Sequence, residues 1–330
     1  MTAIRIHPDV VRAASRGDAV VALETAVLTH GLPRTPMPAP PCCASILAGS
    51  GHAWDAARPA NVELARAVVA AVRAGGATPA TIGMLRGELV IGLNDDELLE
   101  LGAATDAAKL SSRDLAGAHV ARASGGTTVA GTLAALQLAA RSLAKPIRVF
   151  ATGGIGGVHR GWTDRPDVSA DLPALASTPV CVVSAGAKSI LDLPATLEWL
   201  DTFGVPVLGL GTPWFPRFYS EGAAPLAVQR QVASVDEAAA ICAAHWNSFA
   251  SSTAVVVANP PGEWAIPLAE VERAIETGLR ELESRGVRSA EVTPALLAHV
   301  ARATGGRSVD ANVAVLLSNA RVAASLARRL

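Results

Sequence analysis

Lysine is nearly missing from this 330-residue sequence, which contains only Lys109, Lys145 and Lys188. Because 28 residues are basic and 3 of them are lysine, the other 25 are arginine. A guanidinium group stays protonated and cannot act as an amine nucleophile, whereas a lysine removed from water can. The lysines are therefore the first candidates for chemistry.

Long hydrophobic runs, an excess of charge and paired cysteines are also missing. No run approaches the ~18 to 20 apolar residues of a membrane span, and the first 18 residues are broken by charges and a proline, without an apolar signal core. The net charge of −1 argues against nucleic acid or an anionic membrane as a partner. Cys42, Cys43, Cys181 and Cys242 lack the spacing of metal ligands. We expect a reduced, cytoplasmic protein.

Short β-branched stretches alternate with Ala- and Leu-rich amphipathic stretches along the chain. This alternation predicts an α/β fold with a largely parallel sheet covered by helices on both faces. Residues from about 293 onward predict two final helices. The expected strands cover 19–28, 80–85, 88–93, 147–152, 180–185, 205–210 and 253–259, and the expected helices include 62–74, 189–203 and 271–285.

Residues 35–60 do not fit this alternation. The segment is rich in Pro, Ala, Gly and Cys and shows neither the helical nor the strand period. Segments of this length without secondary structure are usually lids or disordered insertions. The composition favours a mobile insertion over an ordered functional lid.

Glu24 lies in the expected strand 19–28, near the start of the stretch LETAVLTHG. A buried carboxyl group there would have a raised pKa and would suit general acid or base catalysis. A position on the solvent face of an edge strand is an equally good interpretation of this residue alone.

A second candidate is the stretch 123–140, where small residues and two threonines lead into a helix. Free backbone N–H groups and the helix dipole at such a start favour an anion, and a phosphate is the expected one. An ordinary capped helix start would have the same sequence.

The stretch 150–172 joins a strand, a glycine loop and an acidic cluster. Asp167 and Asp171 are four residues apart and would share a face if they were helical. Their carboxylates suit a hard cation such as Mg²⁺ or Mn²⁺, held largely by water. Solvated aspartates at a helix start are the alternative, and His159 most simply caps the backbone.

Lys188 lies at the expected junction of a strand and a helix, in CVVSAGAKSILDLP. A helix start and apolar neighbours both disfavour a charged ammonium group, and the neutral amine that results can attack a sugar carbon or a carbonyl. Lys109 is followed by two serines and fits a phosphate contact or a surface turn. Lys145 is expected to be solvated.

These stretches together resemble the pseudouridine-5′-phosphate glycosidase family, also called the indigoidine synthase A-like family. The matching pieces, which include LETAVLTHGLP, KLSSRDL, GTTVAGT, ATGGIGGVHRG, DVSADL and SAGAKSILDLPATLEWL, run in family order over nearly the whole chain apart from residues 35–60. The resemblance implies a single three-layer α/β/α domain over residues 1–330, a homotrimer and a bound Mn²⁺.

The resemblance also implies roles for individual residues. Glu24 matches the proton donor, Lys188 the nucleophile that forms a Schiff base with the sugar, and Asp167 the metal ligand. The expected reaction is reversible cleavage of the C–C bond of pseudouridine 5′-phosphate to uracil and ribose 5-phosphate. Expected substrate contacts are Lys109, Val129, Ser169, Ala170, Asp171 and Asn312.

The sequence departs from the family pattern in three places. Ser124, Gly125 and Gly126 replace the usual Asn-Gly-Ala, and Trp162 stands where smaller residues are usual. Residues 212–216 read TPWFP in place of the usual Thr-Asp/Asn-Glu-Phe-Pro. These aromatic residues and the 35–60 segment are expected to remodel the base pocket. A C-glycosynthase that joins ribose 5-phosphate to an aromatic acceptor is therefore the alternative activity. A non-catalytic sugar-phosphate-binding module is disfavoured because Glu24, Asp167 and Lys188 are all present.

Overall fold

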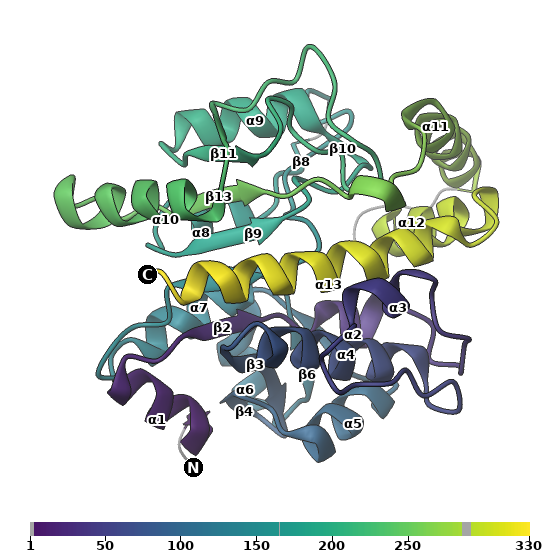
Figure 1. Cartoon of the computed structure of the whole chain (residues 1–330). Coiled ribbons are helices and arrows are strands. Elements are labelled where there is room, and N and C mark those ends of the chain that lie inside the picture. The colour runs from purple at the N-terminus through teal and green to yellow at the C-terminus, as the bar shows by residue number, and fades with distance from the viewer. Residues whose placement is uncertain (1–2, 165, 286–291) are drawn as a thin grey trace.

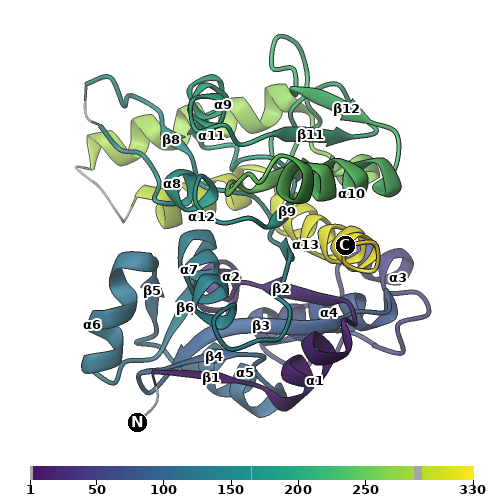
Figure 2. The ribbon, with the colours of Figure 1, turned by 90° about the vertical axis from the view of Figure 1, so that its left-hand side faces the viewer.

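A mostly parallel sheet of eleven strands runs through the protein (Figures 1 and 2). The computed structural model describes residues 3–164, 166–285 and 292–330. The main strand order is β1-β4-β3-β2-β7-β9-β13-β11-β12; β6 pairs with β3 and β5, and β8 and β10 form a separate pair. The strands are β1 (Ile4–Ile6), β2 (Val20–Leu23), β3 (Thr78–Leu85), β4 (Glu88–Ile91), β5 (Ala108–Leu110), β6 (Gly125–Thr127), β7 (Val149–Ala151), β8 (Val158–His159), β9 (Cys181–Ser184), β10 (Leu191–Asp192), β11 (Val207–Leu210), β12 (Arg230–Val232) and β13 (Val255–Ala258).

The parallel sheet that the sequence predicts is confirmed from β3 through β2, β7, β9, β13, β11 and β12. The β3–β4 pair is antiparallel because a two-residue turn joins the two strands. Both turn residues, Arg86 and Gly87, have positive φ, as a tight hairpin of this kind requires.

Helices cover both faces of the sheet, as predicted. Successive residues of β2 alternate between the two cores: Val20 and Ala22 pack in one, Val21 and Leu23 in the other. The long helix α13 crosses one face and contacts β2, β7 and β9 (Figure 1). The helices are α1 (Pro8–Arg16), α2 (Ala26–His30), α3 (Cys42–Ile46), α4 (Ala60–Ala74), α5 (Asp95–Ala103), α6 (Leu115–Val120), α7 (Val129–Ala139), α8 (Asp171–Leu175), α9 (Leu193–Thr202), α10 (Val235–Ala243), α11 (Leu268–Ser284), α12 (Val292–Ala303) and α13 (Arg307–Ala327).

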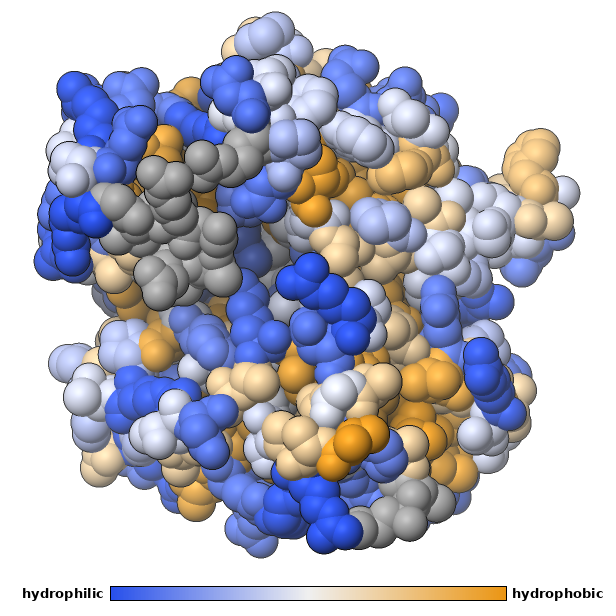
Figure 3. All heavy atoms as spheres, turned by 180° about the vertical axis from the view of Figure 1, so that it is seen from behind, coloured by the Kyte–Doolittle hydropathy of each residue, from blue (hydrophilic) through white to orange (hydrophobic). Residues whose placement is uncertain are grey.

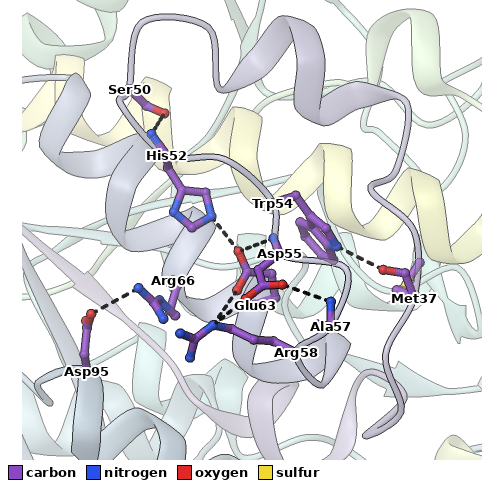
Figure 4. Close-up of polar contacts among 10 residues, drawn as sticks. All are labelled: Met37, Ser50, His52, Trp54, Asp55, Ala57, Arg58, Glu63, Arg66 and Asp95. Atoms are coloured by element: carbon purple, nitrogen blue, oxygen red, sulfur yellow. Dashed lines mark hydrogen bonds and ion pairs between the residues drawn. The ribbon is translucent and has the colours of Figure 1, made fainter.

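The segment 35–60 differs from the mobile insertion that its composition favours. It contains the short helix α3, which packs against α13 and buries Cys42 and Cys43. All four cysteines of the chain are free and buried. The Trp54 indole donates a hydrogen bond to the Met37 carbonyl at 3.1 Å, so the two arms of the segment are joined (Figure 4). Burial of apolar side chains, which the local period does not show, orders this segment.

Glu63 of α4 holds the far end of the same segment. Its carboxylate is 1% exposed, lies 2.9 Å from His52 Nε2 and accepts a hydrogen bond from the Asp55 N–H at 3.1 Å (Figure 4). Arg58 extends toward the same group, with Nε 4.0 Å from Glu63 Oε2. A buried carboxylate is tolerated when it is paired in this way. The segment is therefore tied to α4 by a polar cluster as well as by its apolar contacts.

The surface mixes residue types. In the view from behind, hydrophilic residues lie over both halves of the molecule with smaller hydrophobic groups between them (Figure 3). Among the residues that the structure describes, none of the helices combines the length and the apolar character that crossing a bilayer demands.

Candidate active site

The candidate site lies where neighbouring parallel strands end. The carboxyl ends of β2, β7, β9 and β13 meet at one edge of the sheet, which is where open α/β sheets bind ligands. A cavity of about 470 Å³ opens there. Of the residues predicted for the site, its walls include Glu24, Lys109, Lys188 and Asn312. The structure thus brings together both proposed catalytic groups and two of the expected substrate contacts.

Glu24 directly follows β2, so the prediction that it lies within a strand is wrong. The strand ends at Leu23, and α2 begins two residues after Glu24, because the chain turns into a helix at the sheet edge. The Thr152 hydroxyl donates a hydrogen bond to Glu24 Oε1. Burial raises the pKa of Glu24, and the positive charge of Lys188 and the Thr152 hydrogen bond oppose that rise. This carboxyl group is thus biased toward the protonated form.

Lys188 lies in a loop between β9 and β10, and the predicted helix start at this residue is wrong. The helix α9 begins five residues later, at Leu193, with Asp192 as its N-cap and a proline in its first turn. The helix dipole therefore does not act on the lysine in the way the sequence suggests. Lys188 is instead held by its backbone N–H, which donates to the Ile155 carbonyl at 3.2 Å.

The loop after β7 and the loop after β9 are hydrogen-bonded to each other near Lys188. The Ala185 N–H donates to the Gly153 carbonyl at 2.9 Å, and the Ile155 N–H donates to the Gly186 carbonyl at 3.0 Å. Gly186 has φ +72°, and a β-carbon there would collide with the Pro216 carbonyl oxygen. The glycines of this region are therefore needed for close approach of the backbones, which sets the position of Lys188 relative to β7.

Lys109 comes from β5 and reaches the same cavity. Removal from water lowers the pKa of Lys109, as does the charge of Lys188, while Glu24 and Asp171 raise it. These mutual effects place two amines and two carboxyl groups within electrostatic range of one another. An anionic substrate would relieve the repulsion between the two lysines.

Asp171 is buried and bridges two backbone segments. Its carboxylate accepts from the Ala130 N–H at 2.9 Å and from the Gly156 N–H at 2.8 Å. The start of α7, predicted as an anion site, is thus already bonded in its first turn by a carboxylate of the protein. Asp171 therefore fastens the glycine loop to Val129 and the rest of α7.

The other predicted phosphate contacts surround this bridge. Ser169 Oγ accepts from the Asp171 N–H at 3.2 Å, and Ala170 caps α8. Val129, at the start of α7, is 1% exposed, so only its backbone could face a ligand. Among the residues that line the cavity within the described parts of the chain, Val129, Ser169, Ala170 and Asp171 are not found.

Asp167 lies outside any helix and does not share a helix face with Asp171, which is itself the first residue of α8. Its carboxylate is about half exposed, with Oδ2 3.9 Å from His159 Nδ1. Across residues 3–164, 166–285 and 292–330, no three His, Cys, Asp or Glu side chains converge on one point. A divalent ion at Asp167 would take most of its ligands from water and substrate, which is how Mg²⁺-like ions are commonly held. The residues present fit such an ion.

The opposite wall of the cavity is largely apolar. It is formed by α12 and the start of α13, with Asn312 and the ring of Phe218 among its residues. Phe218 is a non-glycine residue with φ +60°, and its N–H donates to the Ala185 carbonyl at 3.0 Å. Residues in this conformation cluster at functional sites. Neither Phe218 nor Thr152 has a sequence pattern that identifies it; the turn-rich run after β11 is the only signal for Phe218.

The expected remodelling of the pocket by extra aromatic residues is not observed. Phe215 is fully buried in the core, and Trp162 and Trp214 do not line the cavity within the described chain. Segment 35–60 lies on α4 and α13, and its described residues do not line the cavity either.

Comparisons with known proteins show the family to which the chain is similar. The family model described as "Indigoidine synthase A like protein" matches residues 52–329. Pseudouridine-5′-phosphate glycosidases of Herpetosiphon aurantiacus and Myxococcus xanthus are 45% and 41% identical to this chain. The first alignment covers 99% of this chain and 98% of the relative; the second covers 98% and 97%.

Solved structures are also similar. The prealnumycin C-glycosynthase AlnA, crystallised with ribulose 5-phosphate, superposes with a TM-score of 0.83 at 34% identity, covering 99% of this chain and 96% of AlnA. An indigoidine synthase A-like protein from Thermotoga maritima gives a TM-score of 0.78 at 32% identity, covering 98% and 95%.

Proposed function

The chain belongs to the indigoidine synthase A-like family, and from this membership we infer that it is a pseudouridine-5′-phosphate glycosidase. It cleaves the C–C glycosidic bond of pseudouridine 5′-phosphate and releases uracil and ribose 5-phosphate. The observation that supports this chemistry best is the presence of Lys188 and Glu24 in the walls of one cavity, an amine and a carboxyl group biased toward protonation.

The bond to be broken explains the need for an amine. An ordinary glycosidase protonates an oxygen leaving group with one carboxyl of a pair. A C–C glycosidic bond has no such atom, so Lys188 adds its nitrogen to C1′ of the ribose. The C1′–O4′ bond breaks, the ring oxygen takes a proton, and the sugar opens. Covalent catalysis divides one difficult step into several easier ones.

Glu24 then supplies the proton for the leaving base. Oε1 accepts from Thr152, which leaves Oε2 as the oxygen assigned to carry the transferred proton. Glu24 protonates C5 of uracil as the C1′–C5 bond breaks and the lysine nitrogen forms a Schiff base with C1′. Water hydrolyses the Schiff base to ribose 5-phosphate and the free amine. The raised pKa of Glu24 suits this role as an acid.

Substrate contacts and the metal are proposed on the same family basis. Lys109, Val129, Ser169, Ala170, Asp171 and Asn312 would orient the sugar phosphate. Asp167 would hold Mn²⁺, which supplies positive charge to the phosphate when it is bound. We also propose that the protein is a homotrimer and is located in the cytoplasm.

The second candidate function is C-glycosynthesis, in which ribose 5-phosphate is joined to an aromatic acceptor. The similarity to AlnA, solved with a sugar phosphate, favours it, and Lys188 and Glu24 would serve either direction. The relatives named as glycosidases are more similar to this chain, and the aromatic residues expected to reshape the pocket lie away from it.

Trapping the Schiff base tests the proposed function. Borohydride reduction in the presence of ribose 5-phosphate should add the mass of the reduced sugar to Lys188, and pseudouridine 5′-phosphate should release uracil. Lys188→Ala and Lys188→Arg should both lose the adduct, and uracil release should fall by roughly 10⁴-fold or more. Arginine keeps the positive charge, so activity retained in Lys188→Arg would contradict the nucleophile. No uracil release by the unmodified protein, with adduct formation intact, would favour the synthase.

A further inference from the structure

Asn319 is a fully buried polar residue on α13, at 0% exposure, on the side of that helix facing β7. It does not line the cavity within the described chain. An amide in such a place is costly unless its hydrogen bonds are satisfied. Its partners therefore show what the residue does.

The Asn319 carboxamide connects two strand ends. Its Nδ2 donates to the Thr152 carbonyl at 2.7 Å and lies 3.4 Å from the Gly153 carbonyl. Its Oδ1 accepts from Asn259 Nδ2 at 2.9 Å, and Asn259 is anchored in turn by its own N–H on the Ser184 carbonyl at 2.8 Å. The bond from Asn259 fixes which way the Asn319 amide points.

The loop that Asn319 holds contacts the segments of both catalytic groups. The Thr152 hydroxyl donates a hydrogen bond to Glu24. Three residues later in the same loop, the Ile155 carbonyl accepts a hydrogen bond from the Lys188 N–H. The carbonyls of Thr152 and Gly153 lie beyond the last residue of β7. The Gly153 carbonyl also accepts from the Ala185 N–H, whereas the Thr152 carbonyl accepts from the Asn319 side chain. A displacement of this loop would therefore move Glu24's partner and the Lys188 loop together.

From these contacts we propose that Asn319 is a positioning residue: it fixes the loop after β7 and so aligns the Glu24 carboxyl group with the Lys188 amine. This inference rests on the proposed function for its chemistry. Displacement of about 1 Å at a reacting group can cost roughly 10²-fold in rate. Loss of the Asn319 amide should act on the rate of the covalent step, because the expected substrate contacts other than Asn312 come from other elements.

The test compares Asn319→Leu with Thr152→Val and with Ser318→Ala. Ser318 is the matched control, since its hydroxyl accepts from the same Asn259 amide at 3.0 Å but does not contact the loop after β7. The rate of borohydride-trapped adduct formation on Lys188 is measured against ribose 5-phosphate concentration. Asn319→Leu should slow the maximal rate by roughly 10²-fold and change the half-saturating concentration by less than about 3-fold. Ser318→Ala should stay within about 2-fold of the unmodified protein for both.

The pH profile of uracil release separates positioning from a merely structural role. The Thr152 hydrogen bond lowers the pKa of Glu24, so its loss should move the alkaline limb of the profile to higher pH. Asn319→Leu should move the limb in the same direction as Thr152→Val, and the double variant should add no further shift. If Asn319→Leu does not fold, Asn319→Ser replaces it, because serine also lacks the amide. The same changes in adduct formation and in the pH profile are expected of that variant.

The positioning role would be overturned if a folded Asn319 variant kept the maximal rate of adduct formation on Lys188 and the alkaline limb of its pH profile did not move. Adduct formation without uracil release in the unmodified protein would overturn the glycosidase activity alone, and the trapping rates would still decide on Asn319. An unmodified protein that forms no adduct overturns both.

Discussion

Glu24 is a carboxyl group withdrawn from water between a hydroxyl donor and a lysine charge. Its pKa lies above the ordinary value of 4.5 because burial outweighs both partners. The folded state therefore binds this proton more tightly than the unfolded state does. The stability that results is complete below the unfolded pKa and is lost as the pH rises through the folded pKa.

Replacing Glu24 by glutamine should stabilise the protein at neutral pH while abolishing uracil release. The amide keeps the shape of the side chain and can accept from Thr152, but it has no charge to desolvate. Melting temperatures from pH 4 to 8 should show the variant gaining a few degrees on the unmodified protein as the pH rises. A difference that is the same at every pH would contradict a raised pKa for Glu24.

Lys109 should contribute mainly to binding of the phosphate. Lys109→Met is expected to raise KM by roughly 10- to 100-fold with a much smaller change in kcat, because a charge-assisted contact to a phosphate is worth about 1.5–3 kcal/mol. Steady-state kinetics on pseudouridine 5′-phosphate measure both constants. Lys145→Met is the matched control, because no predicted site residue contacts that lysine. A fall in kcat alone would place Lys109 in the chemical step instead.

At the scale of elements, β6 passes α2 at unusually close range. A β-carbon on Gly126 would lie 2.5 Å from the Thr25 carbonyl oxygen and closer still to the Thr29 hydroxyl. This is one of the positions where the chain departs from the Asn-Gly-Ala of its family. The missing methyl group allows α2, and with it the residues after Glu24, to approach the sheet.

Gly126→Ala should destabilise the protein by about 1–3 kcal/mol and lower its activity, because α2 must shift. Thr29→Ala in the same chain should recover part of the stability, and not all of it, since the Thr25 carbonyl belongs to the backbone. Urea unfolding of the two single variants and the double variant measures the coupling. Additive effects would mean that the two side chains do not compete for this space.

The residues that share the candidate cavity are easier to predict from the sequence than the local structure around them. Glu24 and Lys188 stand out as a carboxyl group and a scarce amine in apolar surroundings. The apolar residues after Lys188 continue the helical period and predict a helix start there, but pairing with the loop after β7 overrides that period. Asp192 and the following proline mark the true start of α9.

Residues known only through contacts between distant segments could not be predicted. Thr152 and Asn319 are ordinary residues of a strand end and an amphipathic helix, and their roles come from partners 128 and 167 positions away. The burial of Cys42 and Cys43 depends on α13 in the same way. The period of the hydrophobic residues predicts the layers of the fold, because it depends on which side of one element is buried. It does not predict which elements contact one another.

For the whole molecule, ligand binding should resist unfolding because the cavity is built from both halves of the chain. Ribose 5-phosphate at about 100 times its Kd should stabilise the protein by about 2.7 kcal/mol and raise its melting temperature by a few degrees. Ribose without phosphate, at the same concentration, is the control. Equal shifts with the two sugars would argue against a phosphate site.

The helix α13 follows every other described element in the chain and yet supplies Asn312 to the cavity wall and Asn319 to the loop behind it. On the ribosome, this helix emerges after all of those elements. Until then β2, β7 and β9 lack one of their covering layers, and the nascent chain should be a substrate for chaperones and incapable of capturing a sugar. If Lys188 is the nucleophile, as proposed, it should therefore not react before α13 has been made.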